Sequence, residues 1–201
     1  MELRLKDIST PFFKISELTI ATGERLLIKG PSGTGKTTLL HLLAGLYNPL
    51  QGEVFWDQTS ITRISESEIS HLRKNKMSLV FQNLNLLPYL TAIENLELVG
   101  ISLQSALQTL DKVGLNQKAL TRTQSLSLGE QQRIAVARAL AQNPAVILAD
   151  EATSSLDDQN ADQVMKLFTE HSQTPSLVMV SHDHRVEKYF HRILDMKELT
   201  R

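Results

Sequence analysis

Short hydrophobic runs of the strand type recur along this chain and alternate with segments of helical periodicity. The runs predict β-strands over Leu3–Ile8, Phe13–Ile20, Arg25–Ile28, Glu53–Trp56, Ser78–Phe81, Ala145–Leu148, Ser176–Val180 and Arg192–Met196. Apolar positions three and four residues apart predict helices over Lys36–Ala44, Gly129–Ala141 and Asp158–His171. Because strands alternate with helices, we expect an α/β fold, and the apolar run Val146–Leu148 is typical of a parallel strand buried on both faces.

The distribution of these elements predicts a single domain over residues 1–201 with two specialised parts. No repeat, low-complexity tract or linker rich in Pro, Gly and Ser interrupts the chain. The first third is richer in strands, which indicates a small antiparallel lobe. Residues from about Leu84 to Thr123 lack strong strand runs and, with the helix that follows, predict an inserted helical subdomain over roughly 84–140.

Charge and composition narrow the classes of function. The 21 Lys and Arg residues nearly balance the 22 Asp and Glu residues, which argues against a nucleic-acid partner. No apolar run approaches the roughly 20 residues that span a bilayer, and the charged N-terminus lacks the core of a signal peptide. We therefore expect a cytoplasmic protein without direct membrane insertion. Since the chain stops soon after Leu199, no C-terminal regulatory domain is expected.

One glycine-rich segment has the pattern of a phosphate-binding loop, G-x-x-x-x-G-K-[ST], between a predicted strand and a predicted helix. The predicted phosphate-binding residues are Gly30, Pro31, Ser32, Gly33, Thr34, Gly35, Lys36, Thr37 and Thr38. Glycines let successive backbone N–H groups turn inward, and the following helix begins with free N–H groups and the positive end of its dipole. We expect Lys36 to bridge the β- and γ-phosphates of ATP and the Thr37 hydroxyl to bind Mg²⁺.

Two carboxylates follow the buried strand that ends at Leu148. In a fold with a phosphate-binding loop, the C-terminal end of such a strand faces the nucleotide. Asp150 is then expected to hold Mg²⁺, and Glu151 to orient and polarise the attacking water as a general base. Taken alone, two acids after a strand also fit a solvated turn or a helix cap.

The segment Leu126–Arg133, which reads LSLGEQQR and continues into an alanine-rich helix, resembles the signature segment of ABC ATPases, L-S-G-G-[QE]-Q-Q-R. Three other motifs of that family follow in order: Gln82 resembles the Q-loop glutamine, Ser154–Asp157 the D-loop, and His182 the switch histidine. The resemblance covers essentially the whole chain. It implies a P-loop NTPase core that binds and hydrolyses ATP.

The resemblance also implies roles for the matching residues and a dimer. Two subunits would stand head to tail, as a homodimer or a pseudo-dimer with a related ATPase, and sandwich two ATP molecules. The start of the signature helix would contact the γ-phosphate bound by the other subunit, through Ser127, Gly129 and Glu130. His182 would contact the γ-phosphate from the loop side, Gln82 would contact the metal, and Asp157 would couple the two sites. Singly, Gln82 also fits a solvated strand end and His182 a core histidine.

Members of this family stack an aromatic residue of the N-terminal lobe on adenine. Phe12 is the candidate here, because it follows Asp7-Ile8-Ser9 at about the offset that the family has, and Phe13 is the alternative. Most members have tyrosine at this position, but stacking needs only a ring face. Both residues also fit an ordinary lobe core.

Leu128 departs from the family pattern, which has glycine at this position. Its side chain would either obstruct the sandwich or project away from it and leave the Ser127 hydroxyl and the Gly129 N–H available. We expect a functional site that is slower than one with glycine. The departure also raises the alternative of a nucleotide-binding regulator without hydrolysis, against which Glu151 and His182 argue.

The stretch Phe81–Asn95 resembles the coupling region of the lipoprotein-release and macrolide-export ATPases. In such transporters it receives a helix of a separate transmembrane permease, so an exposed apolar groove is expected at Leu86, Leu87, Pro88 and Tyr89. The resemblance thus implies the ATPase subunit of an ABC transporter, peripheral on the cytoplasmic face of the inner or plasma membrane. The alternative is a non-transport ABC ATPase that scaffolds a cell-division or envelope complex.

Overall fold

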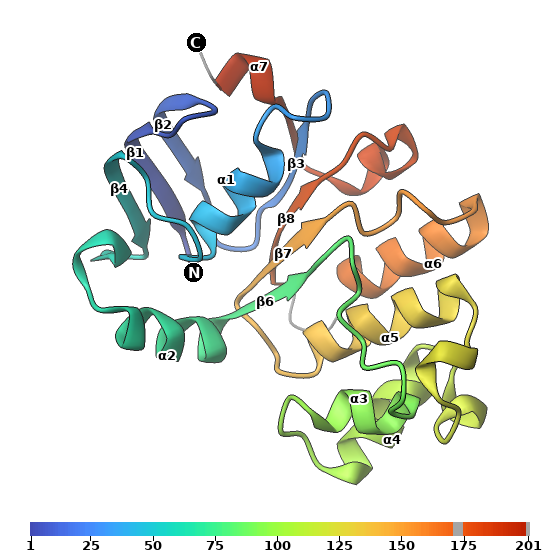
Figure 1. The fold of residues 1–201 in the computed structure, drawn as a ribbon. Helices are drawn as coiled ribbons and strands as arrows, with labels where there is room; N and C mark the ends of the chain where they lie inside the picture. The colour runs from blue at the N-terminus through green and yellow to red at the C-terminus, as the bar shows by residue number, and fades with distance from the viewer. Residues whose placement is uncertain (171–174, 200–201) are drawn as a thin grey trace.

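The computed structural model describes residues 1–170 and 175–199, which form two sheets and the helices around them (Figure 1). A four-stranded antiparallel sheet has the order β2-β1-β4-β5. Its strands are β1 (Leu3–Ser9), β2 (Lys14–Ile20), β4 (Gln51–Trp56) and β5 (Thr59–Ser60). This sheet is the antiparallel N-terminal lobe predicted from the strand-rich first third.

A five-stranded sheet, in which every neighbouring pair is parallel, forms the centre of the molecule with the order β6-β7-β8-β3-β9. Its strands are β3 (Arg25–Lys29), β6 (Met77–Val80), β7 (Val146–Asp150), β8 (Ser176–Val180) and β9 (Arg192–Asp195). Alternate residues of its inner strands enter two separate hydrophobic clusters, so these strands are buried on both faces. The predicted α/β fold with a mainly parallel sheet is confirmed.

Helices cover both faces of this sheet. They are α1 (Lys36–Leu43), α2 (Glu66–Lys76), α3 (Ala92–Glu97), α4 (Leu103–Lys112), α5 (Leu128–Leu140), α6 (Asp158–Thr169) and α7 (Met196–Leu199). Short 3₁₀ helices cover Ile61–Arg63, Asn116–Lys118, Thr123–Ser125 and His184–Tyr189. Side chains of α1 fill the core between the two sheets, whereas α5 and α6 pack on the opposite face. No helix among the described residues is both long and apolar enough to cross a membrane.

The helices α3 and α4 form a lobe of their own, which lies below the sheets in Figure 1. Their apolar side chains share a small core with Ile134 and Ala137 of α5. On another side of α5, Val136 and Leu140 pack with residues of β7 and α6. The helix α5 therefore belongs to the hydrophobic cores of both parts and connects them.

Several elements differ from those predicted, among them β5 and the 3₁₀ helices, which have no counterpart among the predicted runs. The helix α2 was not predicted, although Ser65 and Glu68 form a capping box at its start, and the Ser-x-x-Glu spacing was visible in the sequence. Met196 begins α7 instead of ending the last strand. The helix predicted to end at His171 ends at Thr169, and His171 itself lies outside the described residues.

Candidate functional site

The C-terminal ends of the central parallel strands gather the predicted loop and acidic residues at one edge of the sheet. Strand register places Val180 opposite both Ile28 and Asp150, and Ala149 opposite Val80. The residues that follow these strands therefore leave the sheet side by side. In α/β sheets this edge is where ligands bind.

The phosphate-binding loop follows β3 at this edge and runs directly into α1. Gly33 and Gly35 have φ values of 81° and 90°, a left-handed region that strongly favours glycine. Lys36 begins α1, and its ammonium group donates to the carbonyl oxygens of Gly30 at 2.8 Å and Pro31 at 2.9 Å. The ammonium group of Lys36 thus lies inside the curve of the loop. Phosphate oxygens would replace the two carbonyl oxygens as its hydrogen-bond acceptors.

Thr37 and Asp150 form the candidate metal site. The Thr37 hydroxyl donates to Asp150 Oδ2 at 2.8 Å, although the two residues lie on different elements. Burial raises the pKa of Asp150 above its usual value, and the neighbouring charge of Glu151 adds to this. No group of three or more His, Cys, Asp or Glu side chains that could hold a metal occurs in the part of the chain that the structure describes. Two hard oxygen donors completed by substrate phosphates are what Mg²⁺ prefers, so the residues fit that ion.

Glu151 is held in a defined orientation by both oxygens of its carboxylate. Its backbone has a φ of 48°, and its N–H donates to Val180 O at 2.9 Å. The buried Ser181 hydroxyl donates to Oε2 at 3.0 Å, and His182 Nδ1 lies 2.8 Å from Oε1. His182 is itself largely exposed. The pair places a largely buried carboxylate beside an exposed imidazole, at the edge where the phosphate loop begins.

The structure separates the two adenine candidates, Phe12 and Phe13. A turn organised by the Thr10 hydroxyl, which accepts hydrogen bonds from both of their N–H groups, sends the two rings in different directions. Phe13 is only 4% exposed and belongs to the main core, whereas Phe12 is 59% exposed. Both lie beside Gly35, at which a Cβ would meet their side chains at about 3 Å. Phe12 is thus the ring that can stack on a base next to the phosphate loop.

Replacing Phe12 by alanine is expected to weaken ATP binding by about tenfold, because stacking of a base on an aromatic ring is worth about 1–3 kcal/mol. Phe12→Tyr serves as the matched control, since it keeps the ring face and is expected to bind ATP as the wild type does. Titration calorimetry with ATP measures both. Equal affinity of Phe12→Ala and wild type would show that adenine lies elsewhere.

The signature residues begin α5, far along the chain from the phosphate loop. Ser127 is the N-cap: its hydroxyl accepts the Glu130 N–H at 3.3 Å, and Glu130 accepts the Ser127 N–H at 2.8 Å. This capping box lowers the pKa of Glu130 through the hydrogen bond from the Ser127 backbone. As the first residues of the helix, Leu128 and Gly129 have N–H groups without intrahelical acceptors, which suits an anion.

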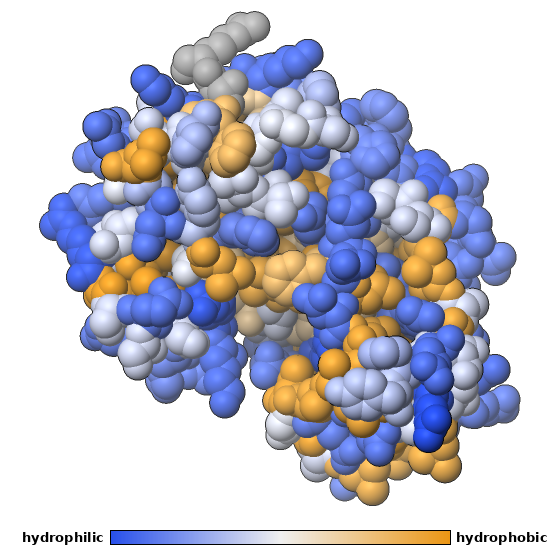
Figure 2. All heavy atoms as spheres, viewed as in Figure 1, coloured by the Kyte–Doolittle hydropathy of each residue, from blue (hydrophilic) through white to orange (hydrophobic). Residues whose placement is uncertain are grey.

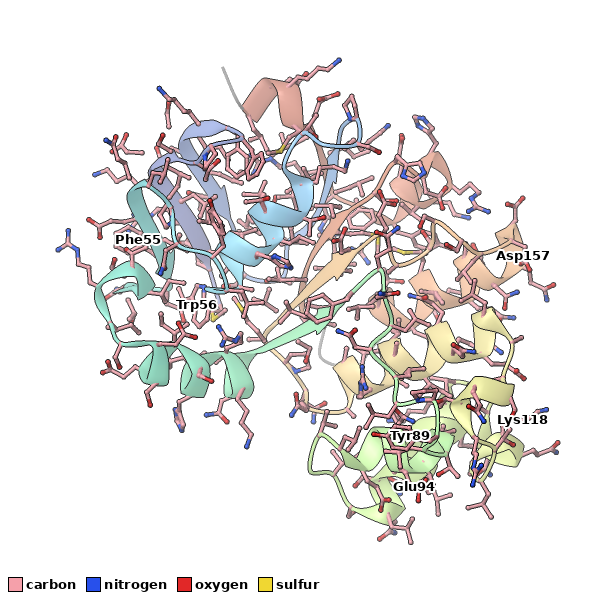
Figure 3. The ribbon with its side chains drawn as sticks, viewed as in Figure 1. Phe55, Trp56, Tyr89, Glu94, Lys118 and Asp157 are labelled. Carbon is pink, nitrogen blue, oxygen red and sulfur yellow. The ribbon has the colours of Figure 1, made fainter. Side chains whose placement is uncertain are left out.

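The start of α5 packs tightly against the start of α6. A Cβ on Gly129 would come within 2.6 Å of Asn160 Oδ1, so a larger residue here would push the Asn160 side chain away from its contact with Arg133. Asp157, the N-cap of α6, accepts from the backbone and the side chain of Asn160 at 2.8 Å each. Figure 3 shows Asp157 at the outer end of α6. Leu128 is 48% exposed, so its side chain extends into solvent at this end of α5.

Gln82 and the apolar segment after it follow β6. The Gln82 side chain is exposed and makes no hydrogen bond within the described residues, although β6 ends beside β7 at the same edge. Arg138 of α5 donates to the carbonyl oxygens of Leu84 and Asn85 at 3.0 and 2.9 Å, which fixes this segment to the signature helix. Burial lowers the pKa of Arg138.

The predicted exposure of the coupling segment is only half correct. Pro88 and Tyr89 are exposed, and Tyr89 stands on the helical lobe in Figure 3. Leu86 and Leu87 are partly buried instead, because Leu86 packs against the core of this lobe and the buried Asn95 binds both polar backbone groups of Leu87. In Figure 2 hydrophobic side chains gather on the visible face of the lobe.

The structure thus brings together the phosphate loop, Asp150, Glu151 and His182, and leaves the signature residues in another part of the molecule. In Figure 1 α1 begins in the upper part of the view, after the loop that follows β3, while α5 begins beside the outer end of α6. Sequence reasoning missed Ser181, which holds the Glu151 carboxylate, and Arg138, which fixes the backbone after Gln82 to α5. A serine directly before His182 at the end of a buried strand was a visible signal for the first. No spacing pattern indicates the second.

Comparison with known proteins agrees with this geometry. A family model described as ABC transporter matches residues 13–154. The lipoprotein-releasing system ATP-binding protein LolD of Xanthomonas campestris pv. campestris is 41% identical, over 94% of this chain and 83% of that protein. The uncharacterized ABC transporter ATP-binding protein YvrO of Bacillus subtilis is 37% identical, over 94% of this chain and 86% of that protein.

A solved structure extends the similarity to three dimensions. A dimeric ATP-binding cassette in a post-hydrolysis state, bound to ADP and Pi, has a TM-score of 0.87 and 34% sequence identity. The match covers 96% of this chain and 93% of that one.

Proposed function

This chain belongs to the ABC transporter family as an ATP-binding and ATP-hydrolysing cassette, and we propose that two copies sandwich two ATP molecules head to tail and drive a separate transmembrane permease. The observation that carries the proposal is the separation of its two half-sites. The loop with Glu151 and His182 lies at one sheet edge, and the signature helix begins elsewhere. A two-fold dimer unites each loop with the partner's signature.

The loop and the first turn of α1 bind the triphosphate. Lys36 exchanges its contacts with Gly30 and Pro31 for phosphate oxygens, and the backbone N–H groups of the loop supply further donors. Thr37 and Asp150 hold Mg²⁺, with Gln82 as a further ligand from the end of β6. When bound, the ion neutralises negative charge on the phosphate oxygens.

Hydrolysis uses Glu151 and His182. Glu151 accepts a proton from the attacking water, whose oxygen forms a bond to the γ-phosphorus while the bond from phosphorus to the β–γ bridging oxygen breaks. ADP and phosphate leave. Because Ser181 and His182 fix both carboxylate oxygens, Glu151 is already oriented before the substrate arrives. His182 then contacts the γ-phosphate and keeps the carboxylate beside the water.

The partner subunit completes each site with the start of its α5. The Ser127 hydroxyl and the free N–H groups of Leu128 and Gly129 face the γ-phosphate from the opposite side. A similar cassette forms a dimer with ADP and Pi, which supports this arrangement. The exposed Leu128 projects from the same end of α5 and slows closure without preventing it.

The permease docks on the apolar segment after Gln82, which places the chain on the cytoplasmic face of the membrane. Relatives named as ATP-binding proteins of a lipoprotein-releasing system and of ABC transporters support this partner. Tyr89 is 62% exposed on the helical lobe, and Arg138 fixes the preceding backbone to α5. Movement of the permease segment would thus reach the signature helix directly.

Tyr89→Glu is expected to remove the permease while leaving ATP binding unchanged. Burying an unpaired polar group costs about 1–3 kcal/mol, so recovery of the partner should fall by about tenfold or more. The measurement is affinity purification of the tagged chain from detergent-solubilised membranes, with mass spectrometry and ATP turnover of the complex.

Ile193→Glu is the matched control, since Ile193 is also exposed but lies on β9, at the opposite edge of the sheet from β6. A protein with several membrane-spanning helices that co-purifies with wild type and with Ile193→Glu, and stimulates turnover, would support the permease. Equal recovery with Tyr89→Glu would contradict docking at this segment. A division-type partner that leaves turnover unchanged would favour a scaffolding role.

A further inference from the structure

The guanidinium of Arg185 connects two loops of the site through all three of its nitrogens. Nε donates to Asp183 Oδ1 and Nη2 donates to Asp183 Oδ2, each at 2.8 Å. The two hydrogen bonds form a bidentate ion pair with one carboxylate. Nη1 donates to Asp158 Oδ1 at 2.6 Å, and Nη2 donates again to Leu156 O at 3.1 Å. Arg185 therefore joins the loop after β8 to the loop after β7, which contains the segment that resembles the D-loop.

On one side, the hydrogen bonds of Arg185 lead through Asp183 and Ser181 to Glu151, the proposed general base. Asp183 is almost fully buried; its backbone N–H donates to Ser181 Oγ at 3.1 Å, and Ser181 Oγ donates to Glu151 Oε2 at 3.0 Å. Thr153, two residues after Glu151, donates its hydroxyl to Asp183 Oδ2 at 3.1 Å. Burial disfavours the charged form of Asp183, but the hydrogen bonds from Arg185 outweigh it and the pKa lies below its usual value.

On the other side, the hydrogen bonds of Arg185 lead through the start of α6 to the signature helix α5. Leu156 and Asp158 flank Asp157, which caps α6 and binds both nitrogens of Asn160. Asn160 Oδ1 accepts from Arg133 Nη1 of α5 at 2.9 Å, and Asn160 also packs against Gly129. Hydrogen bonds, close contacts and the backbone of Leu156 to Asp158 thus form a continuous path from Glu151 to the start of α5.

We propose that Arg185 is a positioning residue that couples the two ATP sites of the dimer through a single chain. The inference rests on the proposed head-to-tail dimer, in which Glu151 of one chain acts on one ATP while its signature helix contacts the other. Arg185 fixes the segment between them, so a change at one site shifts the other. A residue that merely stabilised the fold would not set the cooperativity of hydrolysis.

The test compares wild type with Arg185→Ala and Arg185→Lys in ATP hydrolysis at increasing ATP concentration. For two coupled sites the Hill coefficient of the wild type lies between one and two. In Arg185→Ala the Hill coefficient is expected to fall to one, and the turnover number is expected to fall about fivefold or more. The ATP affinity of the monomer is expected to stay within about twofold of the wild type, because Arg185 touches no predicted nucleotide ligand. Arg185→Lys keeps the positive charge but lacks the planar guanidinium that donates to several acceptors at once. It is therefore expected to retain only part of the cooperativity of the wild type.

Lys188→Ala is the matched control, because Lys188 is a cation on the same 3₁₀ helix, is exposed and pairs with Asp162. It is expected to behave as wild type. A wild-type Hill coefficient in a folded Arg185→Ala protein would overturn the inference, as would an equal loss in Lys188→Ala. If the wild type itself showed a Hill coefficient of one and no ATP-dependent dimer, the proposed function would fail instead.

Asp158→Ala keeps the test decisive if Arg185→Ala does not fold, because alanine offers no acceptor to Arg185 Nη1. Asp158 is largely exposed and loses only its contact with Arg185 Nη1. Its Hill coefficient is expected to lie between those of wild type and one. An unchanged Hill coefficient in this variant, with Arg185→Ala unfolded, would leave Arg185 with a purely structural role and overturn the inference.

Discussion

Glu151→Gln should bind ATP as tightly as the wild type and hydrolyse it roughly 10²–10⁴-fold more slowly, which is the usual contribution of a general base. The amide has the shape of the carboxylate. Its oxygen can still accept from Ser181 and its nitrogen can donate to an unprotonated His182 Nδ1, so the loop keeps its conformation. Only the capacity to take a proton from water is lost. Steady-state phosphate release and calorimetric ATP titration measure the two quantities.

Glu17→Gln is the control, because Glu17 is exposed on β2 and lies outside the site. It should hydrolyse ATP at the wild-type rate. Unchanged hydrolysis in Glu151→Gln would mean that another residue positions the water.

The same variant tests the sandwich, because a dimer that cannot hydrolyse ATP cannot reopen. Light scattering of Glu151→Gln is expected to show a monomer without nucleotide and a dimer with ATP and Mg²⁺. A monomer that still binds ATP would contradict closure by this chain alone. Restoration of the dimer by Leu128→Gly would then assign the block to that leucine, whose side chain stands at the end of the signature helix.

Lys36→Ala should abolish tight ATP binding. Its ammonium is the one side-chain cation within the phosphate loop, and hydrogen bonds to charged groups contribute about 1.5–3 kcal/mol each, or roughly ten- to hundredfold per bond. The ammonium is already inside the loop on the Gly30 and Pro31 carbonyls, so no large rearrangement precedes binding. Calorimetry or displacement of a fluorescent nucleotide measures the loss.

Lys74→Ala removes an equal charge from an exposed position of α2 and controls for net charge. It should bind ATP as the wild type does. Retained micromolar affinity in Lys36→Ala would contradict the assignment of this loop as the triphosphate site. Thermal unfolding of both variants shows whether the fold is intact.

The sequence by itself determined the class of fold and the residues of the phosphate loop. Strand runs such as Val146–Leu148 are apolar because both of their faces are buried, and this pattern is local and readable. The loop was readable for a similar reason, since it lies on consecutive residues whose glycines adopt left-handed φ values. The short helices of the lobe gave weaker signals, as their stability comes from packing on α5 rather than from a long periodic pattern.

Only the tertiary structure decided which candidate residues are exposed, which are buried in the core, and which distant residues contact them. The sequence indicates Phe12 as the candidate and Phe13 as the alternative, and the structure adds that the turn at Thr10 buries Phe13 in the core and leaves Phe12 exposed. Leu86 belongs to an apolar run but packs inward. The contacts of Arg185 with two loops depend on side chains that meet across strand ends, and hydrogen bonds between residues far apart in the chain leave no periodic trace in the sequence.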